Sequence, residues 1–273
     1  MGTGWNRRGA LLRLAMAMAM AMASGASWAQ APAAGTSGLD AILRRGKVLI
    51  AVDMGSPPYA MTDAQMKPQG ADVEAAELLA KDLGVPLEIV PTTGQGRVPV
   101  LLSGKADFVM ATFSITTDRA KSVAFSNPYG IIRSVVFGAK NVAIKTPADM
   151  KSKRIGVTRG TTQEGALADT APQGTTITRF DDDATAIAAL ASGQVDALAT
   201  ADNRGFVLNQ RFPDRFEVKY ELGIFYYAVG MRRGDPDLQH WVDTWVFVNM
   251  HNGTLSRIFA KWLKSDLPTL PTM

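Results

Sequence analysis

Hydrophobic and polar positions alternate along the first half of the chain in a pattern that predicts strands separated by helices. Short β-branched runs are typical of buried strands, whereas apolar residues three or four apart mark one face of a helix. Val73, Ala76 and Ala80 have this helical spacing. Gly84 then provides a stop signal. The predicted elements are strand 47–52, helix 72–84, strand 87–90, helix 97–104 and strand 106–112. This order predicts a parallel sheet with helices on its faces.

The alternation starts again in the second half of the chain. Apolar runs predict strands at 134–139, 154–158, 175–180 and 195–200, and helical spacing predicts helices at 161–169, 183–193 and 202–210. Asp183 is a plausible N-cap of the second of these helices. Residues 216 to 232 predict two further strands.

The C-terminal pattern is helical on both sides of a break at Gly253. Trp241, Trp245 and Trp262 fall on the apolar faces of these two helices. Tryptophans can surround a ligand, but their helical spacing favours a role as anchors that dock the tail on a sheet.

Each α/β half has the usual size of a domain, about 100 residues. We therefore predict an α/β protein of two lobes, each a mostly parallel sheet with flanking helices, with the second lobe inserted into the first. Lobe 1 is expected at 39–129 and 228–273, lobe 2 at 130–227, and the hinge crossings near 127–133 and 222–228. Such lobes can close on a ligand held outside the carboxyl ends of the strands.

The first 29 residues have the pattern of a cleaved signal peptide. Arg7, Arg8 and Arg13 precede an apolar run, and small residues lead to an expected cleavage site after Ala29. A membrane anchor is disfavoured because the apolar run is shorter than the ~20 residues that a spanning helix needs. The arginine pair leaves both general and twin-arginine export open, and residues 30–38 predict a flexible leader. The mature protein is expected in the periplasm.

Composition narrows the function further. Removal of the signal's three arginines lowers the formal net charge from +4 to +1, so we expect no nucleic-acid partner. The absence of cysteine excludes disulfides and a thiol for a lipid anchor. His240 and His251 both fall in the predicted tail helices, and no metal, nucleophile or dinucleotide motif is present. The sequence therefore predicts no metal, no cofactor and no catalytic residues.

The stretch "ATFSITTDRAKSVAFSNPYG", residues 111–130, places hydroxyl groups around a single arginine. The hydroxyls lie between a strand end and a helix start, where free backbone N–H groups can bind an anion. The guanidinium of Arg119 suits a carboxylate held by two parallel hydrogen bonds. In the alternative interpretation, Thr116 or Thr117 only caps the helix and Arg119 pairs with a nearby acid.

A second helix start in "GVTRGTTQEG" (156–165) offers Thr161 and Thr162. It lacks the phosphate-loop pattern, but it suits a carboxylate clamp that faces Arg119 across a cleft. An amino acid ligand also needs an acid for its ammonium group. Asp202 follows the strand 195–200 and is the favoured acid, while Asp53 is a weaker candidate.

The sequence is less specific about the roles of two further residues, Asp196 and Tyr59. Asp196 lies nearer the turn before strand 195–200 and is expected to be structural. Tyr59, in "PPY", could cover the apolar stem of a ligand or simply pack its loop.

The sequence resembles the family 3 extracellular solute-binding proteins, the periplasmic receptors of ABC importers for polar amino acids. The matching segments are "GKVLIAVD…PPYA", "GADVEAAELLAKDLGVPLEIVP", "RVPVLLSGKADFVMATFSITTDRAKSVAFSNPY", "IGVTRGTTQE", "ALASGQVDALATAD" and "NGTLSRIFAKWL". They run in order over nearly all of residues 40 to 265, and the serine-to-tyrosine block around Arg119 is the most specific of them.

The resemblance implies a site in which Arg119 holds the α-carboxylate of an L-amino acid. By the same pattern Ser114 and Thr112 support the ligand's α-groups, Thr161 and Thr162 add contacts from the second lobe, and Tyr59 and Phe113 line the side-chain pocket. One departure concerns the α-amino group. The family's aspartate usually follows the acid of the "VDA" block by five residues, but that position is Ala201, and Asp202 comes one residue later.

The function implied by the resemblance is the capture of a free, polar L-amino acid by a monomer that delivers it to an inner-membrane ABC permease. The alternative is a periplasmic cyclohexadienyl dehydratase acting on prephenate or arogenate with the same fold, for which Glu164 is the candidate acid. The preferred ligand side chain stays open, because Arg97, Arg133 and Arg159 could reach the pocket and favour acidic ligands or could face solvent.

Overall fold

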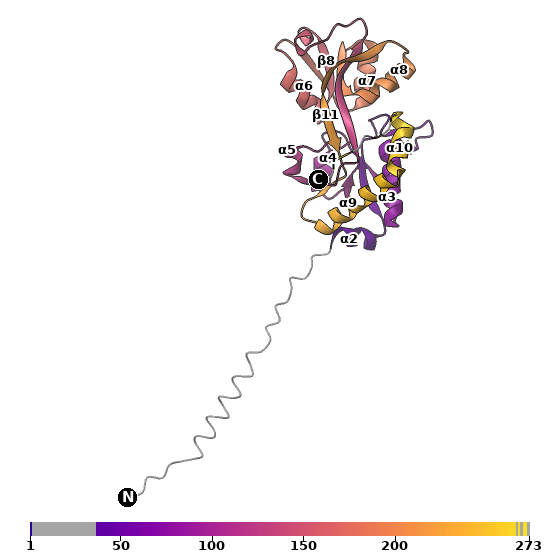
Figure 1. Cartoon of the computed structure of the whole chain (residues 1–273), viewed down its shortest axis with the longest axis vertical. Helices are drawn as coiled ribbons and strands as arrows, with labels where there is room; N and C mark the ends of the chain where they lie inside the picture. The colour runs from indigo at the N-terminus through magenta and orange to yellow at the C-terminus, as the bar shows by residue number, and fades with distance from the viewer. Residues whose placement is uncertain (2–36, 266, 268–269, 272–273) are drawn as a thin grey trace. The chain divides into compact units, whose positions relative to one another are not determined.

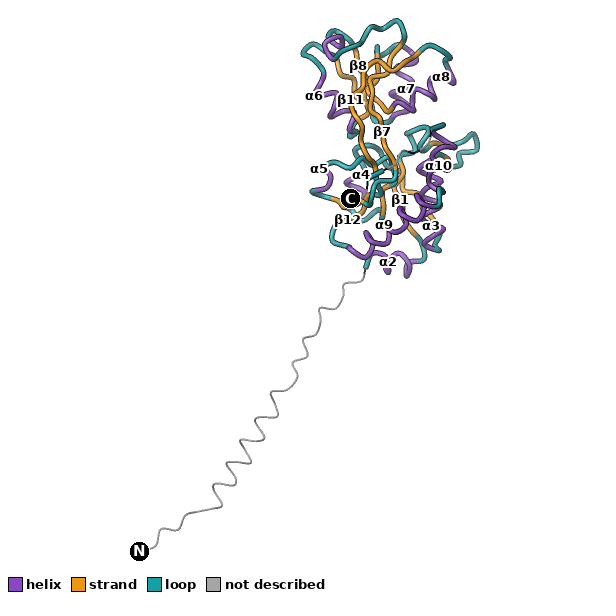
Figure 2. Tube along the Cα trace, in the orientation of Figure 1, coloured by secondary structure: helices purple, strands orange, loops and turns teal. Residues whose placement is uncertain are grey.

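The computed structural model describes Met1, residues 37–265, Leu267 and residues 270–271 (Figures 1 and 2). The predicted signal peptide with Arg7, Arg8, Arg13 and Ala29, and most of the predicted leader, lie outside the described residues. Among the helices that are described, none is long and apolar enough to cross a membrane.

The first sheet has five strands, β1 (Val48–Val52), β4 (Leu87–Pro91), β5 (Phe108–Val109), β6 (Val123–Phe125) and β12 (Gly230–Arg232). Their spatial order is β4-β1-β5-β12-β6. Strand β1 is parallel to β4 and β5, whereas β12 is antiparallel to its two neighbours. Since β12 comes from the far end of the chain and lies inside this sheet, the first lobe is built from two separate parts of the sequence, as predicted.

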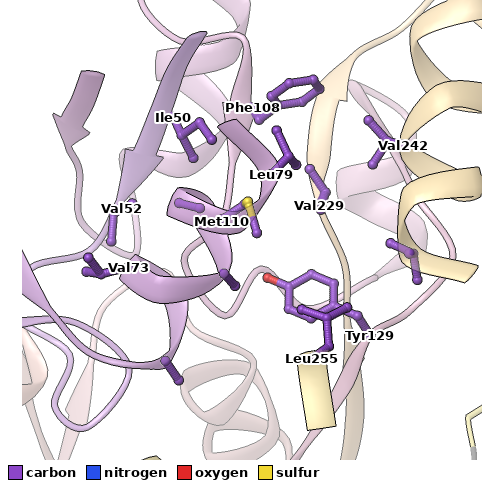
Figure 3. Close-up of a cluster of buried hydrophobic side chains, with 14 of the residues drawn as sticks. Ile50, Val52, Val73, Leu79, Phe108, Met110, Tyr129, Val229, Val242 and Leu255 are labelled. Atoms are coloured by element: carbon purple, nitrogen blue, oxygen red, sulfur yellow. The ribbon is translucent and has the colours of Figure 1, made fainter. Parts of the chain in front are cut away.

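Six of the described helices belong to this first lobe, namely α2 (Gly38–Arg45), α3 (Ala71–Leu83), α4 (Arg97–Leu102), α5 (Thr117–Ala120), α9 (Pro236–His251) and α10 (Thr254–Leu263). A two-stranded hairpin, β2 (Met61–Thr62) and β3 (Pro68–Gln69), precedes α3. Figure 3 shows side chains from the sheet and from α3 and α9 meeting in the core, including Ile50, Leu79, Phe108 and Val242. Trp245 is buried in the same core, which agrees with the predicted anchoring role of the tail.

The second sheet comprises β7 (Gly130–Ala139), β8 (Arg154–Thr158), β9 (Thr176–Phe180), β10 (Ala197–Ala201) and β11 (Phe216–Tyr227). Their order is β11-β7-β10-β8-β9, with a parallel core of β10, β8 and β9. Helices α6 (Thr162–Thr170), α7 (Asp183–Ser192) and α8 (Asp202–Arg211) complete the second lobe, together with a 3-10 turn η1 (Pro147–Met150).

Strands β7 and β11 connect the two lobes (Figure 2). They pair in antiparallel fashion along their length, from Phe216 opposite Ala139 to Tyr227 opposite Gly130. At the first-lobe end, the Tyr129 amide donates to the Tyr227 carbonyl at 3.1 Å. The rings of Tyr59, Tyr129 and Tyr227 pack around this point and are fully buried. The two connecting strands therefore emerge from a buried aromatic cluster.

Two local predictions differ from the structure near the carboxyl ends of strands. The strand expected over 106–112 is regular only at β5, because the backbone turns away from the sheet and Thr112 has a φ of +46°. The N-cap of α7 is Asp182, whose side chain accepts a hydrogen bond from the Thr185 amide at 2.7 Å. Asp183 is instead the first helical residue, and its side chain is free to point elsewhere.

Candidate functional site

Arg119, on α5, bridges the two lobes through its guanidinium group. Nη1 donates to the Ser114 carbonyl oxygen at 2.7 Å, and Nη2 donates to the Gly160 carbonyl oxygen at 2.8 Å. Its carbon Cζ lies 5.0 Å from the centre of the Phe113 ring. Among the described residues no carboxylate forms an ion pair with this guanidinium, so the alternative that Arg119 serves a nearby acid finds no partner. Burial, with a smaller effect of Arg97, lowers the pKa of Arg119 to about 10, and the group stays charged at neutral pH.

The hydroxyl groups near Arg119 have separate tasks. The Ser114 and Thr162 hydroxyl oxygens lie 3.5 Å apart across the two lobes. Thr161 caps α6, since its hydroxyl accepts from the Glu164 amide at 3.2 Å and donates to the Thr158 carbonyl at 2.7 Å. Thr116 caps α5 in the same way, accepting from the Arg119 amide at 3.2 Å. Ser114 and Thr162 are thus the hydroxyls that face each other beside the guanidinium.

Thr112 and Phe113 are buried residues of the first lobe that come directly before Ser114. Thr112 is held in its left-handed conformation by Asp72, whose carboxylate accepts from the Thr112 amide at 2.9 Å. Burial of Asp72 at the start of α3 raises its pKa to about 7. Phe113 is fully buried and packs against Phe125 with ring centres 4.9 Å apart. The Phe113 ring therefore packs against both Phe125 and the Arg119 guanidinium and helps to fix the position of that guanidinium.

The backbones of two segments, residues 94–95 of the first lobe and residues 159–160 of the second, lie close together near Arg119. Gly160 has a φ of +70°, and a Cβ atom there would lie 2.7 Å from the Gln95 amide nitrogen. A Cβ atom on Gly94 would lie 2.3 Å from the Arg159 carbonyl oxygen. Only glycine permits such an approach, so the sequence pair Gly94 and Gly160 places the Gly160 carbonyl within reach of Arg119.

Glu164 stabilises the loop that carries this carbonyl. One of its carboxylate oxygens accepts from the Gly160 amide at 2.8 Å, and the other accepts from Arg179 Nε at 2.7 Å. Both oxygens are engaged in holding the protein's own loop. This geometry gives Glu164 a structural task and provides no support for its use as the acid of a dehydration.

A cluster of four buried charges lies next to Arg119. On the first lobe, Arg97 pairs with Asp53 at 3.6 Å, and on the second lobe Arg204 pairs with Asp183. Burial raises the pKa of Asp53 and lowers the pKa of Arg97, while each partner opposes the change in the other. The sequence analysis did not identify Asp183 and Arg204 as residues of the site. Both lie in the first turn of a helix that follows a strand, and this position was the available signal.

Ser56 ties the two halves of this cluster together. Its hydroxyl donates to the Asp183 carboxylate at 2.9 Å and accepts from Arg204, and Thr158 donates to the other oxygen of Asp183 at 2.6 Å. Nearby, the amide of Ala184 donates to the Gly55 carbonyl at 3.0 Å. The loop after β1 is thus bonded directly to the start of α7.

Tyr59 belongs to the loop after β1 in the first lobe, and Asp202 begins α8 in the second lobe. The Tyr59 ring is fully buried, its hydroxyl accepts from Asn203, and burial raises its pKa. Asp202 is partly exposed and accepts from Arg133 Nε at 2.9 Å. Ala201, the position of the family's usual acid, is fully buried.

Asp196 is bonded to Arg154, at 2.8 Å to its amide and 2.7 Å to its guanidinium. It therefore secures the start of β8. Within the described ranges, no group of three or more His, Asp and Glu side chains is arranged to hold a metal ion.

A family model of bacterial extracellular solute-binding proteins, family 3, matches residues 48–265. The chain is a family 3 extracellular solute-binding protein. The resemblance inferred from the sequence motifs is thereby confirmed over nearly the whole described part of the chain.

Named relatives of this solute-binding protein bind amino acids. The L-cystine-binding protein TcyJ of Escherichia coli (strain K12) is 31% identical over 232 residues, which cover 84% of this chain and 87% of that protein. The glutamate/aspartate import solute-binding protein of Salmonella typhimurium is 28% identical and covers 87% of this chain and 83% of its own length. The names of these relatives describe binding proteins and not enzymes.

Solved structures agree with the two-lobed fold. The solute receptor for L-cysteine of Neisseria gonorrhoeae has a TM-score of 0.77 at 33% identity and covers 82% of this chain and 93% of its own. The ancestral amino acid-binding protein AncCDT-1, a precursor of cyclohexadienyl dehydratase, has a TM-score of 0.78 at 32% identity and covers 83% and 100%. The solute-binding protein therefore has the two-lobed α/β fold that its sequence predicts.

Proposed function

We propose that this protein captures a polar L-amino acid between its two lobes in the periplasm and delivers it to an ABC permease of the inner membrane. Arg119 carries the proposal. It is a half-buried, charged guanidinium, whose only described partners are two carbonyl oxygens and an aromatic face. A carboxylate is the group that most strongly compensates such a cation, through two parallel hydrogen bonds.

The contacts between the lobes support capture by closure. The Ser114 and Thr162 hydroxyls, which come from different lobes, lie 3.5 Å apart, and the Ser114 carbonyl accepts from Arg119. Donors and acceptors of both lobes converge on a carboxylate only when the lobes are together. A ligand that gains these contacts only in the closed state shifts the population toward that state.

Asp202 is the proposed acceptor for the ammonium group. It lies close enough to Tyr59 to influence the pKa of that side chain. Its single hydrogen bond within the described structure, from Arg133, uses one of its two carboxylate oxygens. A carboxylate can accept several hydrogen bonds, so Asp202 retains the capacity to bind an ammonium group.

The proposed periplasmic location and the proposed delivery to a permease are based on membership of the family. Its members are extracellular solute-binding proteins, and the chain begins with the features of a signal peptide. The identity of the bound amino acid does not follow from the relatives, because their names include glutamate, aspartate, L-cystine and L-arginine.

A thermal-shift screen with the twenty amino acids and L-cystine tests the proposal. A ligand that binds only the folded protein raises its melting temperature, so at least one amino acid is expected to give a clear rise. Calorimetric titration of that ligand into Asp202→Asn, with Asp196→Asn as the matched control, then tests the ammonium acceptor. No response to any amino acid, together with loss of prephenate or arogenate on incubation, would replace the proposal with the dehydratase alternative.

A further inference from the structure

We infer that Arg204 is a specificity-determining residue, whose guanidinium occupies a built-in cation site between the lobes and so prevents the binding of basic amino acids. The inference deepens the proposed function and rests on it for the statement about amino acids. The occupation of the site by Arg204 is independent of any ligand.

Arg204 extends from the second lobe onto the first. It lies in the first turn of α8, and its Nη2 donates to both the Asp183 carboxylate and the Ser56 hydroxyl. Its Cζ atom lies 5.6 Å from the centre of the Tyr59 ring. Ser56 and Tyr59 belong to the loop after β1, whereas Asp183 belongs to α7 of the second lobe.

These three partners are the kinds of group that bind a guanidinium or ammonium ion. A carboxylate supplies the opposite charge, a hydroxyl accepts a hydrogen bond, and an aromatic face attracts a cation. The site is also enclosed, since Arg204 is 4% exposed and Asp183 is 6% exposed. The protein's own side chain thus fills a site that would otherwise suit the end of an arginine or lysine ligand.

The cation site adjoins the proposed ligand position. Thr158 donates its hydroxyl to Asp183 at 2.6 Å, and its carbonyl accepts from Thr161 at 2.7 Å, next to Thr162 of the proposed site. Asp53 and Asp183 balance the charges of Arg97 and Arg204. Of these three arginines, Arg119 is the one whose charge remains for the ligand's carboxylate.

A basic ligand side chain would add a further positive charge next to three arginines. It would find Asp183 already paired with Arg204, and buried like charges without a partner are strongly unfavourable. Removal of Arg204 would leave the buried Asp183 carboxylate without its positively charged partner and with hydrogen bonds from hydroxyl groups alone. A cation from solution is then expected to take the place of the missing guanidinium.

Chemical rescue tests this directly. We would measure the melting temperature of Arg204→Ala with methylguanidinium chloride, and with sodium chloride at the same ionic strength. The matched control is Arg154→Ala, which removes a half-exposed guanidinium paired with Asp196 on the same lobe. Methylguanidinium at tenfold its Kd is expected to raise the melting temperature of Arg204→Ala by about 3–6 °C. It should leave the wild type and Arg154→Ala unchanged. No selective rise for a folded Arg204→Ala would overturn the cation site.

The second arm concerns specificity. L-arginine and L-lysine should not stabilise the wild type, and at least one of them should bind Arg204→Ala about tenfold or more tightly than it binds the wild type. Tight binding of L-arginine by the wild type would contradict the inference. Should Arg204→Ala not fold alone, its refolding yield with and without methylguanidinium becomes the measurement, and an unchanged yield counts against the site.

The two proposals fail in different ways. Methylguanidinium has no carboxylate, so its binding does not need Arg119. Rescue of Arg204→Ala without any amino acid response would reject the proposed function and keep the cation site. An amino acid response without rescue would support the proposed function and reject the cation site.

Discussion

The guanidinium of Arg119 donates a hydrogen bond to the carbonyl oxygen of Gly160 at 2.8 Å, across the boundary between the lobes. The two residues are 41 positions apart, with Arg119 on α5 of the first lobe and Gly160 in the loop between β8 and α6 of the second lobe. The side chain that is proposed to hold the ligand therefore also contacts the opposite lobe. Ligand affinity and lobe closure are expected to depend on the same pair.

Replacement of Arg119 should weaken amino acid binding. Arg119→Ala is expected to lower the affinity by about 30-fold or more, since loss of a buried charged partner typically costs 2–5 kcal/mol. Arg119→Lys should recover only part of this loss, because an ammonium group cannot form the bidentate contact. Calorimetric titration of the ligand found in the screen provides the measurement. Arg257→Ala, an exposed arginine on α10, serves as the control, and equal affinities for all three variants would contradict the role of Arg119.

Replacement of Gly160 should impair closure. Gly160→Ala and Gly193→Ala both place a side chain at positive φ, +70° and +77° respectively. The added Cβ atom meets the Gln95 backbone at Gly160 but nothing within 4 Å at Gly193. Both variants should lose about 1 kcal/mol or more of stability, while only Gly160→Ala should lose ligand affinity, by about tenfold. Similar affinities for the two variants, measured by titration, would show that the approach at Gly160 is unimportant for binding.

The raised pKa of Asp72 predicts how stability depends on pH. Its pKa rises from 3.8 to about 7 on folding, so the folded protein retains a proton that the unfolded chain releases. The contribution of Asp72 to the free energy of unfolding therefore decreases as the pH rises from about 4 to about 7 and is constant above that.

Asp72→Asn keeps an oxygen that can accept from the Thr112 amide, but it does not titrate. The variant should be more stable than the wild type at pH 8, by a few degrees in Tm, and the difference should shrink at pH 5. Thermal unfolding followed by circular dichroism measures both values. The exposed Asp118→Asn is the control, and a difference that is the same at both pH values would reject this assignment.

Two tryptophans of the tail allow a matched test of buried hydrogen bonds. Trp245 Nε1 donates to the Asp82 carboxylate at 2.9 Å, whereas the buried Nε1 of Trp262 has no hydrogen-bond partner within the described structure. Trp245→Phe should lower the free energy of unfolding by about 1–3 kcal/mol more than Trp262→Phe does. Chemical denaturation of both variants gives the comparison. If Trp262→Phe proved the more damaging change, packing would outweigh the hydrogen bond.

The sequence predicted those features that depend on local spacing. Val73, Ala76 and Ala80 are buried on α3, as their helical period requires, because one apolar face of a helix must pack on the sheet. The family motif around Arg119 likewise placed a guanidinium beside hydroxyls at a strand end. Both inferences use residues within a few positions of each other.

Contacts between distant residues were not visible in the sequence. Arg204 meets Ser56 across 148 positions, and nothing in the local pattern around either residue indicates the pairing. The partner of Asp202 on β7 was equally hidden, since Arg133 could have faced solvent. Asp183 was predicted to cap its helix because Asp182 and Asp183 are chemically equivalent in sequence, and only tertiary contacts distinguish them.

The return of β12 to the first sheet has a consequence for how the protein acquires its structure. This strand lies between β5 and β6, and α9 and α10 follow it, so the first sheet lacks one of its internal strands until most of the chain is present. The strands of the second sheet are contiguous, and such short-range pairing forms faster than pairing between distant segments. We expect pulse-labelling hydrogen exchange to show protection of β8, β9 and β10 before β1 and β5. The inserted middle segment of the chain would then act as the folded support on which the two flanking segments are completed.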